Sequence, residues 1–235
     1  MKEETIQLSI VIPALNEEKT IGICVDKALN AFKQMKGVQG EVVIADNGST
    51  DSTAQIAEKR GARVIRVERR GYGHALIGGF QSAKSKYLIM GDADDSYNFE
   101  EISVFVEKFR DGYDFIIGNR FKGRIERGAM PFFHRYVGTP VLTATMNLFF
   151  RTGIGDVNCG MRGLVKDAFE KMRLKAGGME LATEMVIKAS VLKLKIAEVP
   201  CNLYKDKRAG KSHLKTWQDG WRHLRLMLLF TKRTP

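Results

Sequence analysis

Apolar, β-branched runs alternate with helical patterns through the first half of the chain, and this alternation restricts the fold more than any other feature. Such runs are typical of buried strands, and apolar residues recur at helical spacing between them. Parallel strands need helical crossovers of this kind, whereas antiparallel strands need only a tight turn. The sequence therefore predicts the α/β class, with a mostly parallel sheet and helices on both faces. The predicted strands are 8–14, 41–46, 62–67, 86–92 and 113–120.

The pattern changes after Phe121. A link rich in Gly and Arg leads to an amphipathic segment, 131–150. One face of this segment carries Leu142, Met146, Phe149 and Phe150. The elements predicted beyond it are a helix from about 180 to 192, a strand over 195–201 and an amphipathic helical tail over 213–230. No repeat or linker divides the chain, so we expect a single domain, 1–235, made of two halves, 1–121 and 122–204, and a basic tail, 205–235.

The chain has 235 residues and a net charge of +11, and much of the excess lies near its end. Residues 205–235 contain nine Lys and Arg but only two Asp. A basic tail favours an anionic partner such as nucleic acid, a phospholipid surface or a phosphorylated substrate. The alternative is a solvated surface with no partner.

The three cysteines have no metal-type spacing, and the N-terminal residues are polar. Both features are typical of a reducing, cytoplasmic setting. The longest uncharged segment that we considered, 136–150, is shorter than the roughly 18 apolar residues that span a bilayer. We therefore expect it to be an interfacial or core segment.

Three carboxylates, Asp92, Asp94 and Asp95, crowd the end of the fourth predicted strand. Two like charges about 4 Å apart repel by about 4 kcal/mol at an effective dielectric constant near 20. Mg²⁺ or Mn²⁺ would remove this repulsion, because such an ion binds one or two carboxylates and completes its shell with phosphate oxygens and water. Asp92 and Asp94 are therefore candidate metal ligands. The alternative is a solvent-facing acidic turn, and we expect Asp95 and Ser96 to cap the next helix in either case.

Polar residues also follow the first two predicted strands, and parallel strands bring such ends to one edge of the sheet. Pro13, Asn16 and Glu17 follow the first strand, and Asp46 ends the second, where it could meet a ribose or a base. Glu17 also suits the first turn of a helix, where the helix dipole stabilises a carboxylate. Asp51 is typical of a helix cap.

Five segments of the chain, in order, resemble the inverting family-2 glycosyltransferases. They are IVIPALNEE, ADNGSTDST, GDAD, GNRF and RAGKSHL. The closer match is to the branch that makes polyprenyl-phosphate sugars. This resemblance implies a GT-A type, Rossmann-like fold. It also implies metal-dependent transfer of a sugar, with inversion, from a nucleotide-diphosphate donor to a polyprenyl phosphate. GDP-mannose and UDP-glucose are both compatible donors, and Mg²⁺ or Mn²⁺ is the implied cofactor.

The resemblance also implies roles for single residues. In the family pattern, the D-x-D aspartates bind the metal and the donor diphosphate, and two arginines hold the acceptor phosphate. The implied catalytic residues are Asp92, Asp94, Arg120 and Arg135. The implied donor-binding residues are Pro13, Asn16, Glu17, Asp46, Ala93, Arg208 and Ser212.

Two positions depart from related patterns. Asn47 stands where the family has the second of two aspartates, which leaves its donor contact open. In residues 218–222, QDGWR, Trp precedes Arg, whereas processive synthases carry Q-x-x-R-W. We therefore predict no processivity.

The implied acceptor needs no general base, because a phosphate monoester has a second pKa near 6 and is already charged at neutral pH. A lipid acceptor does require the site to meet a membrane. The 131–150 segment and the tail, with Trp217, Trp221, Leu224 and Leu228 at helical spacing, are typical of interfacial helices beside anionic lipid. We expect a peripheral protein at the inner, cytoplasmic face of the membrane. The alternative is that these faces pack on the core.

Other function classes fit less well. A family-2 enzyme acting on a soluble or cell-wall glycan remains an alternative. A phosphatase with the D-x-D-x-S nucleophile lacks the later acidic pair, and a dehydrogenase lacks G-x-G-x-x-G after a strand. A nucleic-acid-binding module would explain the positive charge, but carboxylates at the sheet edge would repel a phosphate backbone, so we predict no nucleic-acid partner.

Overall fold

The computed structural model describes residues 6–208 and 216–231. The strands are β1 (Ile6–Ala14), β2 (Val38–Asp46), β3 (Arg63–Arg66), β4 (Tyr87–Met90), β5 (Phe115–Asn119), β6 (Arg162–Val165) and β7 (Ile196–Pro200). The helices are α1 (Ile21–Gln34), α2 (Thr53–Lys59), α3 (Tyr72–Ser82), α4 (Ser103–Arg110), α5 (Thr139–Phe150), α6 (Lys166–Met172), α7 (Leu181–Val191) and α8 (Thr216–Thr231), with a 3-10 turn η1 (Phe99–Glu101) and a π-helical turn η2 (His134–Gly138).

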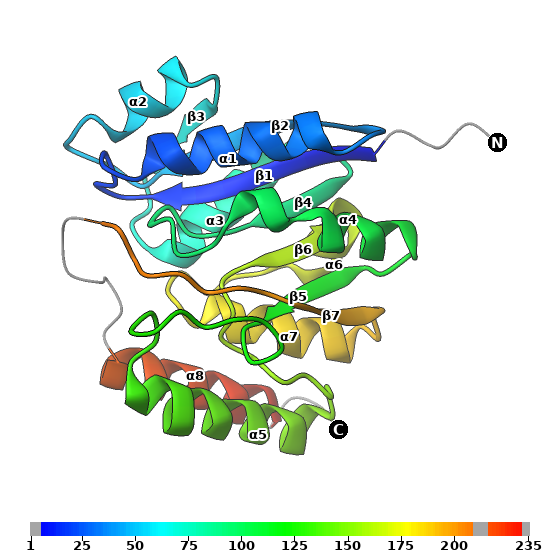
Figure 1. Cartoon of the computed structure of the whole chain (residues 1–235). Coiled ribbons are helices and arrows are strands. Elements are labelled where there is room, and N and C mark those ends of the chain that lie inside the picture. Colours follow the sequence, from blue (N-terminus) through cyan, green and yellow to red (C-terminus); the bar gives the residue numbers. More distant parts are fainter. Residues whose placement is uncertain (1–5, 209–215, 232–235) are drawn as a thin grey trace.

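The strands form one seven-stranded sheet in the order β3-β2-β1-β4-β6-β5-β7. Every pair is parallel except the two that β6 makes. Helices α1 and α4 cover one face of the sheet, and α3, α6 and α7 cover the other (Figure 1). The predicted α/β class, with a mostly parallel sheet between helices, is confirmed.

Strand β6 and helix α6 are the elements that the sequence did not predict. Strand β6 lies between β4 and β5 and runs antiparallel to both, with Arg162 opposite Met90 on one side and Ile117 on the other. Its first residue therefore lies at the sheet edge where β4 and β5 end. The loop that leads into β6 enters the same edge.

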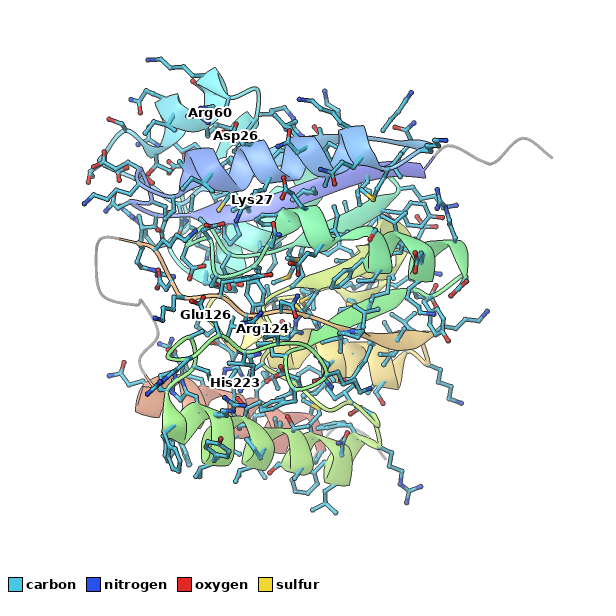
Figure 2. All side chains as sticks on the ribbon, viewed as in Figure 1. Asp26, Lys27, Arg60, Arg124, Glu126 and His223 are labelled. Atoms are coloured by element: carbon cyan, nitrogen blue, oxygen red, sulfur yellow. The ribbon has the colours of Figure 1, made fainter. Side chains whose placement is uncertain are left out.

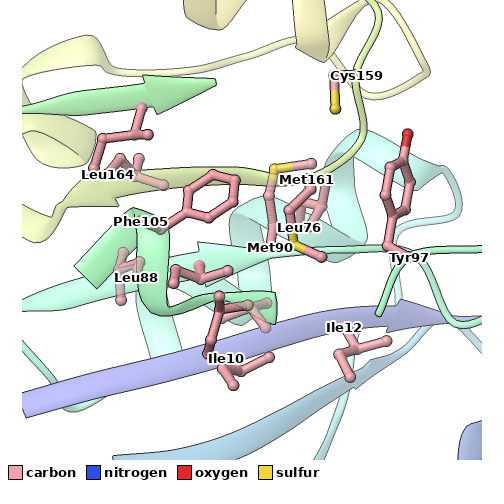
Figure 3. Packing of buried hydrophobic residues seen from close by; sticks show 14 of the residues in the cluster. Ile10, Ile12, Leu76, Leu88, Met90, Tyr97, Phe105, Cys159, Met161 and Leu164 are labelled. Atoms are coloured by element: carbon pink, nitrogen blue, oxygen red, sulfur yellow. The ribbon is translucent and has the colours of Figure 1, made fainter. Parts of the chain in front are cut away.

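The core fills both faces of the central strands and includes Ile10, Ile12, Leu88 and Met90, which Figure 3 labels. Each such side chain contributes roughly 1.5–3 kcal/mol by burial. The sequence predicted that Pro13 ends the first strand at position 14, and β1 does end at Ala14. A proline is tolerated inside this central strand because pairing with β4 stops at Val11.

Helices α5 and α8 lie side by side beyond the β7 end of the sheet (Figure 1), so the predicted helical tail is present as α8. The buried face of α5 carries Met146 and Phe150, together with Thr139 and Thr143. Phe149 was expected on that face but is 45% exposed. The prediction missed this because a count of apolar residues does not show that two threonines complete the packed stripe.

Candidate functional site

Asp92 and Asp94 follow β4 at the carboxyl edge of the sheet, as the sequence predicted. Asp92 Oδ1 accepts a hydrogen bond of 2.8 Å from the Tyr72 hydroxyl at the start of α3. Burial, and then the nearby charge of Asp94, raise the pKa of Asp92 to about 6. Ala93 between them is buried, and its carbonyl accepts from the Cys24 thiol. The charge of Asp94 is thus close enough to disfavour ionisation of Asp92.

Arg208 is the cation that pairs with Asp94 in the structure. Its Nη2 binds Asp94 Oδ2, and its Nη1 lies 3.6 Å from Glu17 Oε1. Glu17 is buried, and burial raises its pKa. We define Glu17, Asp92 and Asp94 as the acidic cluster. Arg208 connects two of its members that come from different strand ends.

Asp95 and Ser96 do not cap the next helix, so that prediction is wrong. Asn98 caps η1 instead, accepting from the Glu100 amide at 3.1 Å. Asp95 is buried and makes ion pairs of 2.6 Å with Lys27 on α1 and 2.8 Å with Lys207. The side chain is thus turned inward, where it fixes the D-x-D turn against two other parts of the chain.

Asp46 and Asn16 lie at the ends of β2 and β1, where the turn after β2 binds both. Asp46 is buried and accepts from the amides of Gly48 (3.3 Å) and Ser49 (3.1 Å). Asn16 has a left-handed backbone (φ 57°), and its Oδ1 accepts from the Thr50 amide at 2.8 Å. Pro13 is buried inside β1 and supports this edge through the backbone. Ser52, not the predicted Asp51, is the N-cap residue of α2, although Asp51 accepts from the Thr53 amide at 3.0 Å.

Asn47, which departs from the family pattern, has a structural role. Its Nδ2 donates to the carbonyls of Val67 (2.9 Å) and Arg69 (3.0 Å), and its Oδ1 accepts from the Gly71 amide at 2.7 Å. An aspartate here would face the two carbonyls with no proton to offer. The amide therefore fixes the β3–α3 loop beside Asp46.

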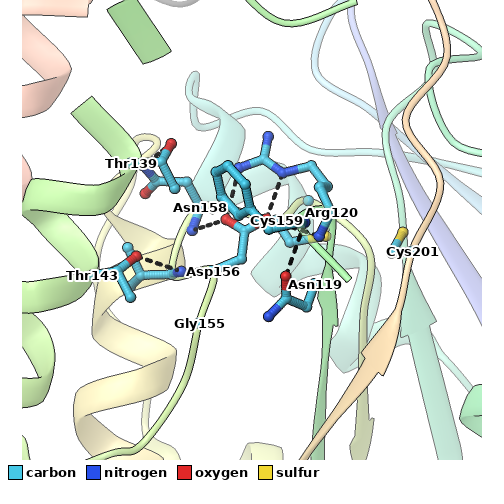
Figure 4. Close-up of polar contacts among 12 residues, drawn as sticks. Asn119, Arg120, Thr139, Thr143, Gly155, Asp156, Asn158, Cys159 and Cys201 are labelled. Atoms are coloured by element: carbon cyan, nitrogen blue, oxygen red, sulfur yellow. Dashed lines mark hydrogen bonds and ion pairs between the residues drawn. The ribbon is translucent and has the colours of Figure 1, made fainter. Parts of the chain in front are cut away.

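Arg120 follows β5 and is held by Asp156, a partner that the sequence analysis did not identify (Figure 4). Its Nε and Nη2 donate to the two carboxylate oxygens of Asp156 at 2.7 and 2.8 Å. Asp156 is fully buried, and its backbone amide and that of Gly155 donate to Glu198 on β7. A bidentate pair of this kind fixes the plane of a guanidinium.

Arg135 lies on η2, before α5, with its guanidinium carbon 5.5 Å from the centroid of the Tyr136 ring. Burial, and then the charge of Arg120, lower the pKa of the neighbouring His134. Turn η2 is therefore close to Arg120. Ser212 lies outside the described residues.

The segment 201–208 brings Lys207 and Arg208 to the acidic cluster. The amide of Tyr204 donates to the Ser96 carbonyl at 2.9 Å, and that of Lys207 to the Asp94 carbonyl at 3.0 Å. The other side of the segment pairs with the loop 122–130. There the amides of Leu203 and Glu126 bond to the carbonyls of Arg124 and Leu203 at 2.9 Å. Figure 2 labels Arg124 and Glu126 on this loop.

The described residues contain no group of three or more His, Cys, Asp or Glu side chains that could hold a metal alone. The acidic cluster nevertheless fits a divalent cation that is shared with a ligand. Carboxylate oxygens are its preferred protein ligands, and Mg²⁺ needs only one or two of them. Burial, and then the charge of Asp94, raise the pKa of Asp92, and a bound cation would offset both effects. A ligand with phosphate oxygens would complete the shell.

Comparison with known proteins identifies relatives over nearly the whole chain. The family described as "Glycosyl transferase family 2" matches residues 9–173. The low-salt glycan biosynthesis hexosyltransferase Agl6 of Haloferax volcanii is 41% identical over 223 residues, which are 94% of this chain and 53% of that protein. A dolichyl-phosphate hexose transferase of the same organism is 31% identical over 215 residues, covering 91% of this chain and 89% of that protein. This chain thus spans about half the length of the first relative and most of the second.

A solved structure has the same architecture. The glucosyl-3-phosphoglycerate synthase of Mycobacterium tuberculosis, crystallised with Mn²⁺, UDP and glucosyl-3-phosphoglycerate, superposes with a TM-score of 0.72 at 22% identity. The match covers 98% of this chain and 81% of that one. This likeness supports the predicted GT-A fold, and the dolichyl-phosphate relative supports the predicted branch. The chain belongs to glycosyl transferase family 2 and is a glycosyltransferase.

Proposed function

We propose that the chain transfers a hexose from a nucleotide-diphosphate sugar to the phosphate of a polyprenyl phosphate. The observation that carries this proposal is the placement of two opposite charge patterns at one sheet edge. An acidic cluster that suits a metal-bound diphosphate faces an arginine, Arg120, whose plane is fixed by a buried carboxylate. Arg120 is near enough for its positive charge to offset part of the rise in the pKa of Asp92. A donor and an anionic acceptor could therefore meet between them.

On the donor side, Asp92 and Asp94 would hold Mg²⁺ or Mn²⁺, which when bound would stabilise the negative charge of the leaving diphosphate. Arg208 would leave Asp94 and bind the donor diphosphate instead, because the diphosphate is also an anion. Asp46 and Asn16, fixed by the turn after β2, would bind the nucleoside, with Pro13 and Glu17 supporting that edge. UDP-glucose and GDP-mannose are both candidates for the donor.

On the acceptor side, Arg120 and Arg135 would bind the phosphate of the polyprenyl phosphate. Two nitrogens of Arg120 are occupied by Asp156, so the residue is oriented before the acceptor arrives. The acceptor oxygen is already charged at neutral pH and needs no general base. In-line attack on the anomeric carbon would then invert its configuration.

The acceptor is a lipid, and the face formed by η2, α5 and α8 suits an anionic membrane surface. No helix in the described parts of the chain is long and apolar enough to cross a bilayer. Large apolar side chains instead protrude from this face, including Phe132 (75% exposed), Leu148 (76%) and Trp221 (64%). Arginines 135, 222 and 225 lie on the same turn and helices. We propose peripheral binding to the cytoplasmic face of the membrane. Residues 1–121 would bind the donor and 122–204 the acceptor, with Arg120 at the end of the first half also on the acceptor side.

Replacement of Asp94 tests the metal assignment. We expect Asp94→Ala to lower transfer from a labelled nucleotide sugar to polyprenyl phosphate by about 10³-fold, a typical cost of losing stabilisation of the leaving charge. The matched control is Asp111→Ala, which removes an exposed carboxylate at the end of α4. Circular dichroism checks that both variants fold. Turnover like that of the wild type in Asp94→Ala would refute the assignment.

Arg135 is assigned to the acceptor, and steady-state kinetics can distinguish this from a donor role. We expect Arg135→Ala to raise KM for polyprenyl phosphate by about tenfold, the effect of losing a charge-assisted hydrogen bond, and to change KM for the nucleotide sugar less. Arg110→Ala on α4 is the control. A larger rise in the donor KM would place Arg135 on the donor side.

We expect the ionised form of Asp92 to lower the stability of the fold, because the side chain is buried. Its pKa of about 6 is higher than in the unfolded chain, so its contribution to stability is present below pH 4 and is lost as the pH rises through 6. Asp92→Asn stays neutral, and we expect its Tm at pH 7.5 to exceed that of the wild type by about 3 °C, the effect of about 1 kcal/mol. This difference should narrow as the pH falls from 7 to 4. Calorimetric scans that show the same difference at every pH would contradict the charge argument.

Flotation with liposomes tests the membrane-binding face. We expect the double variant Phe132→Ser and Leu148→Ser to lose most of its binding to vesicles with anionic lipid, because it removes two protruding apolar side chains. Ile23→Ser on α1, where the apolar side chain is 40% exposed, is the matched control. Equal flotation of all three proteins, or no flotation of the wild type, would exclude this face as the membrane contact.

A further inference from the structure

Arg162, the first residue of β6, is the largest fully buried side chain described in the structure. Its three guanidinium nitrogens donate to three backbone carbonyls. Nε donates to Cys159 at 2.9 Å, Nη2 to Val157 at 2.6 Å and Nη1 to Ala182 at 2.6 Å. Two of these carbonyls lie in the loop before β6, and the third lies in the first turn of α7. The side chain therefore joins this loop to a helix on one face of the sheet.

The charge of Arg162 is unusual because no carboxylate in the described parts of the chain lies within ion-pair distance of it. Arg120 and Arg208, in contrast, each pair directly with an aspartate. Burial of a cation costs several kcal/mol unless its hydrogen bonds are satisfied. A neutral side chain would fill the space without this cost. The position therefore requires a planar group with donors pointing in three directions.

The loop fixed by Arg162, residues 156–160, touches both sides of the site. At one end, Asp156 holds Arg120 (Figure 4). At the other end, the Gly160 amide donates to the Tyr97 hydroxyl at 2.9 Å. Gly160 is so close to the acidic cluster that an added Cβ would lie 2.5 Å from Asp92 Oδ2. Movement of this loop would disturb both Arg120 and the space around Asp92.

We propose that Arg162 is a positioning residue that sets the loop 156–160 and, through Asp156, the orientation of Arg120. The acceptor role of Arg120 rests on the proposed function, whereas the fixing of the loop does not. The register of β6 explains how Arg162 lies close to both sides of the site. Arg162 lies opposite Met90 and Ile117, two residues before Asp92 and three before Arg120.

Arg162→Lys is the informative substitution, since it keeps the charge and most of the length. A single ammonium nitrogen cannot occupy the three positions that the guanidinium nitrogens occupy, so part of the loop loses its donor. Val43→Ala in β2 is the control for general destabilisation. Val43 is fully buried and lies in a strand that is separated from β6 by β1 and β4.

Hydrogen exchange measured by mass spectrometry tests the positioning without substrate. Amides in this loop bond to side chains, such as that of Val157 to Thr143 and that of Asn158 to Asp156. We expect Arg162→Lys to speed exchange in a peptide covering 156–160 by about tenfold, and Val43→Ala to leave that peptide close to the wild type. Equal exchange in the wild type and Arg162→Lys, or equal acceleration in both variants, would overturn the proposal.

A double-mutant cycle tests whether Arg162 acts through Arg120. We expect Arg162→Lys to raise KM for polyprenyl phosphate by about tenfold with little change in donor KM. In an Arg120→Ala background, Arg162→Lys should raise this KM almost no further, because the side chain that Arg162 orients is already absent. Equal effects in both backgrounds would overturn the link to Arg120. If the wild type transfers nothing to polyprenyl phosphate while the exchange result holds, the proposed function fails and the positioning of the loop stands.

Discussion

Carboxylates that converge at one edge of a parallel sheet must be neutralised, and much of this structure supplies the cations that do so. Asp94 and Glu17 approach Arg208, and Asp95 pairs with Lys27 and Lys207. These cations come from α1 and from the segment 201–208, which are far apart in the sequence. The acidic edge thus determines where distant parts of the chain lie. Among the described residues, Asp92 accepts a side-chain hydrogen bond only from the Tyr72 hydroxyl, and burial, then the charge of Asp94, raise its pKa.

Three arginines around this edge, of which Arg162 is buried and Arg120 and Arg208 are partly buried, differ in their partners. Arg208 faces carboxylates of the proposed metal site, and we propose that a metal-bound donor would exchange with this contact. Arg120 is held by a fully buried aspartate, which fixes its direction. In the described parts of the chain, the hydrogen bonds of the Arg162 guanidinium all go to backbone carbonyls, which fixes the backbone there. Arginine suits all three positions because its rigid fork offers several donors with defined directions.

The sequence predicted the parts of the fold and site that depend on local pattern. Apolar runs identified six of the seven strands, and the spacing of Asp92 and Asp94 identified the acidic edge. Strand β6 was missed because its four residues, RGLV, include a glycine and form no β-branched apolar run like those of the other strands. Asp156 was missed as the partner of Arg120 because 36 positions separate them, and only the return of the chain along β6 brings them together. Asn47 looked like a lost ligand, although its amide fixes a neighbouring loop.

The pairing of the segment 201–208 with the loop 122–130 has a consequence for how two substrates influence each other. One face of the segment carries Arg208 to the acidic cluster, and the other is joined by backbone hydrogen bonds to the loop that follows Arg120. A shift of the backbone that carries Arg208 would either carry that loop with it or break those bonds. Such a backbone shift would couple the two sides of the candidate site. Thermodynamic reciprocity requires that whatever one ligand does to the affinity for the other is returned in equal measure.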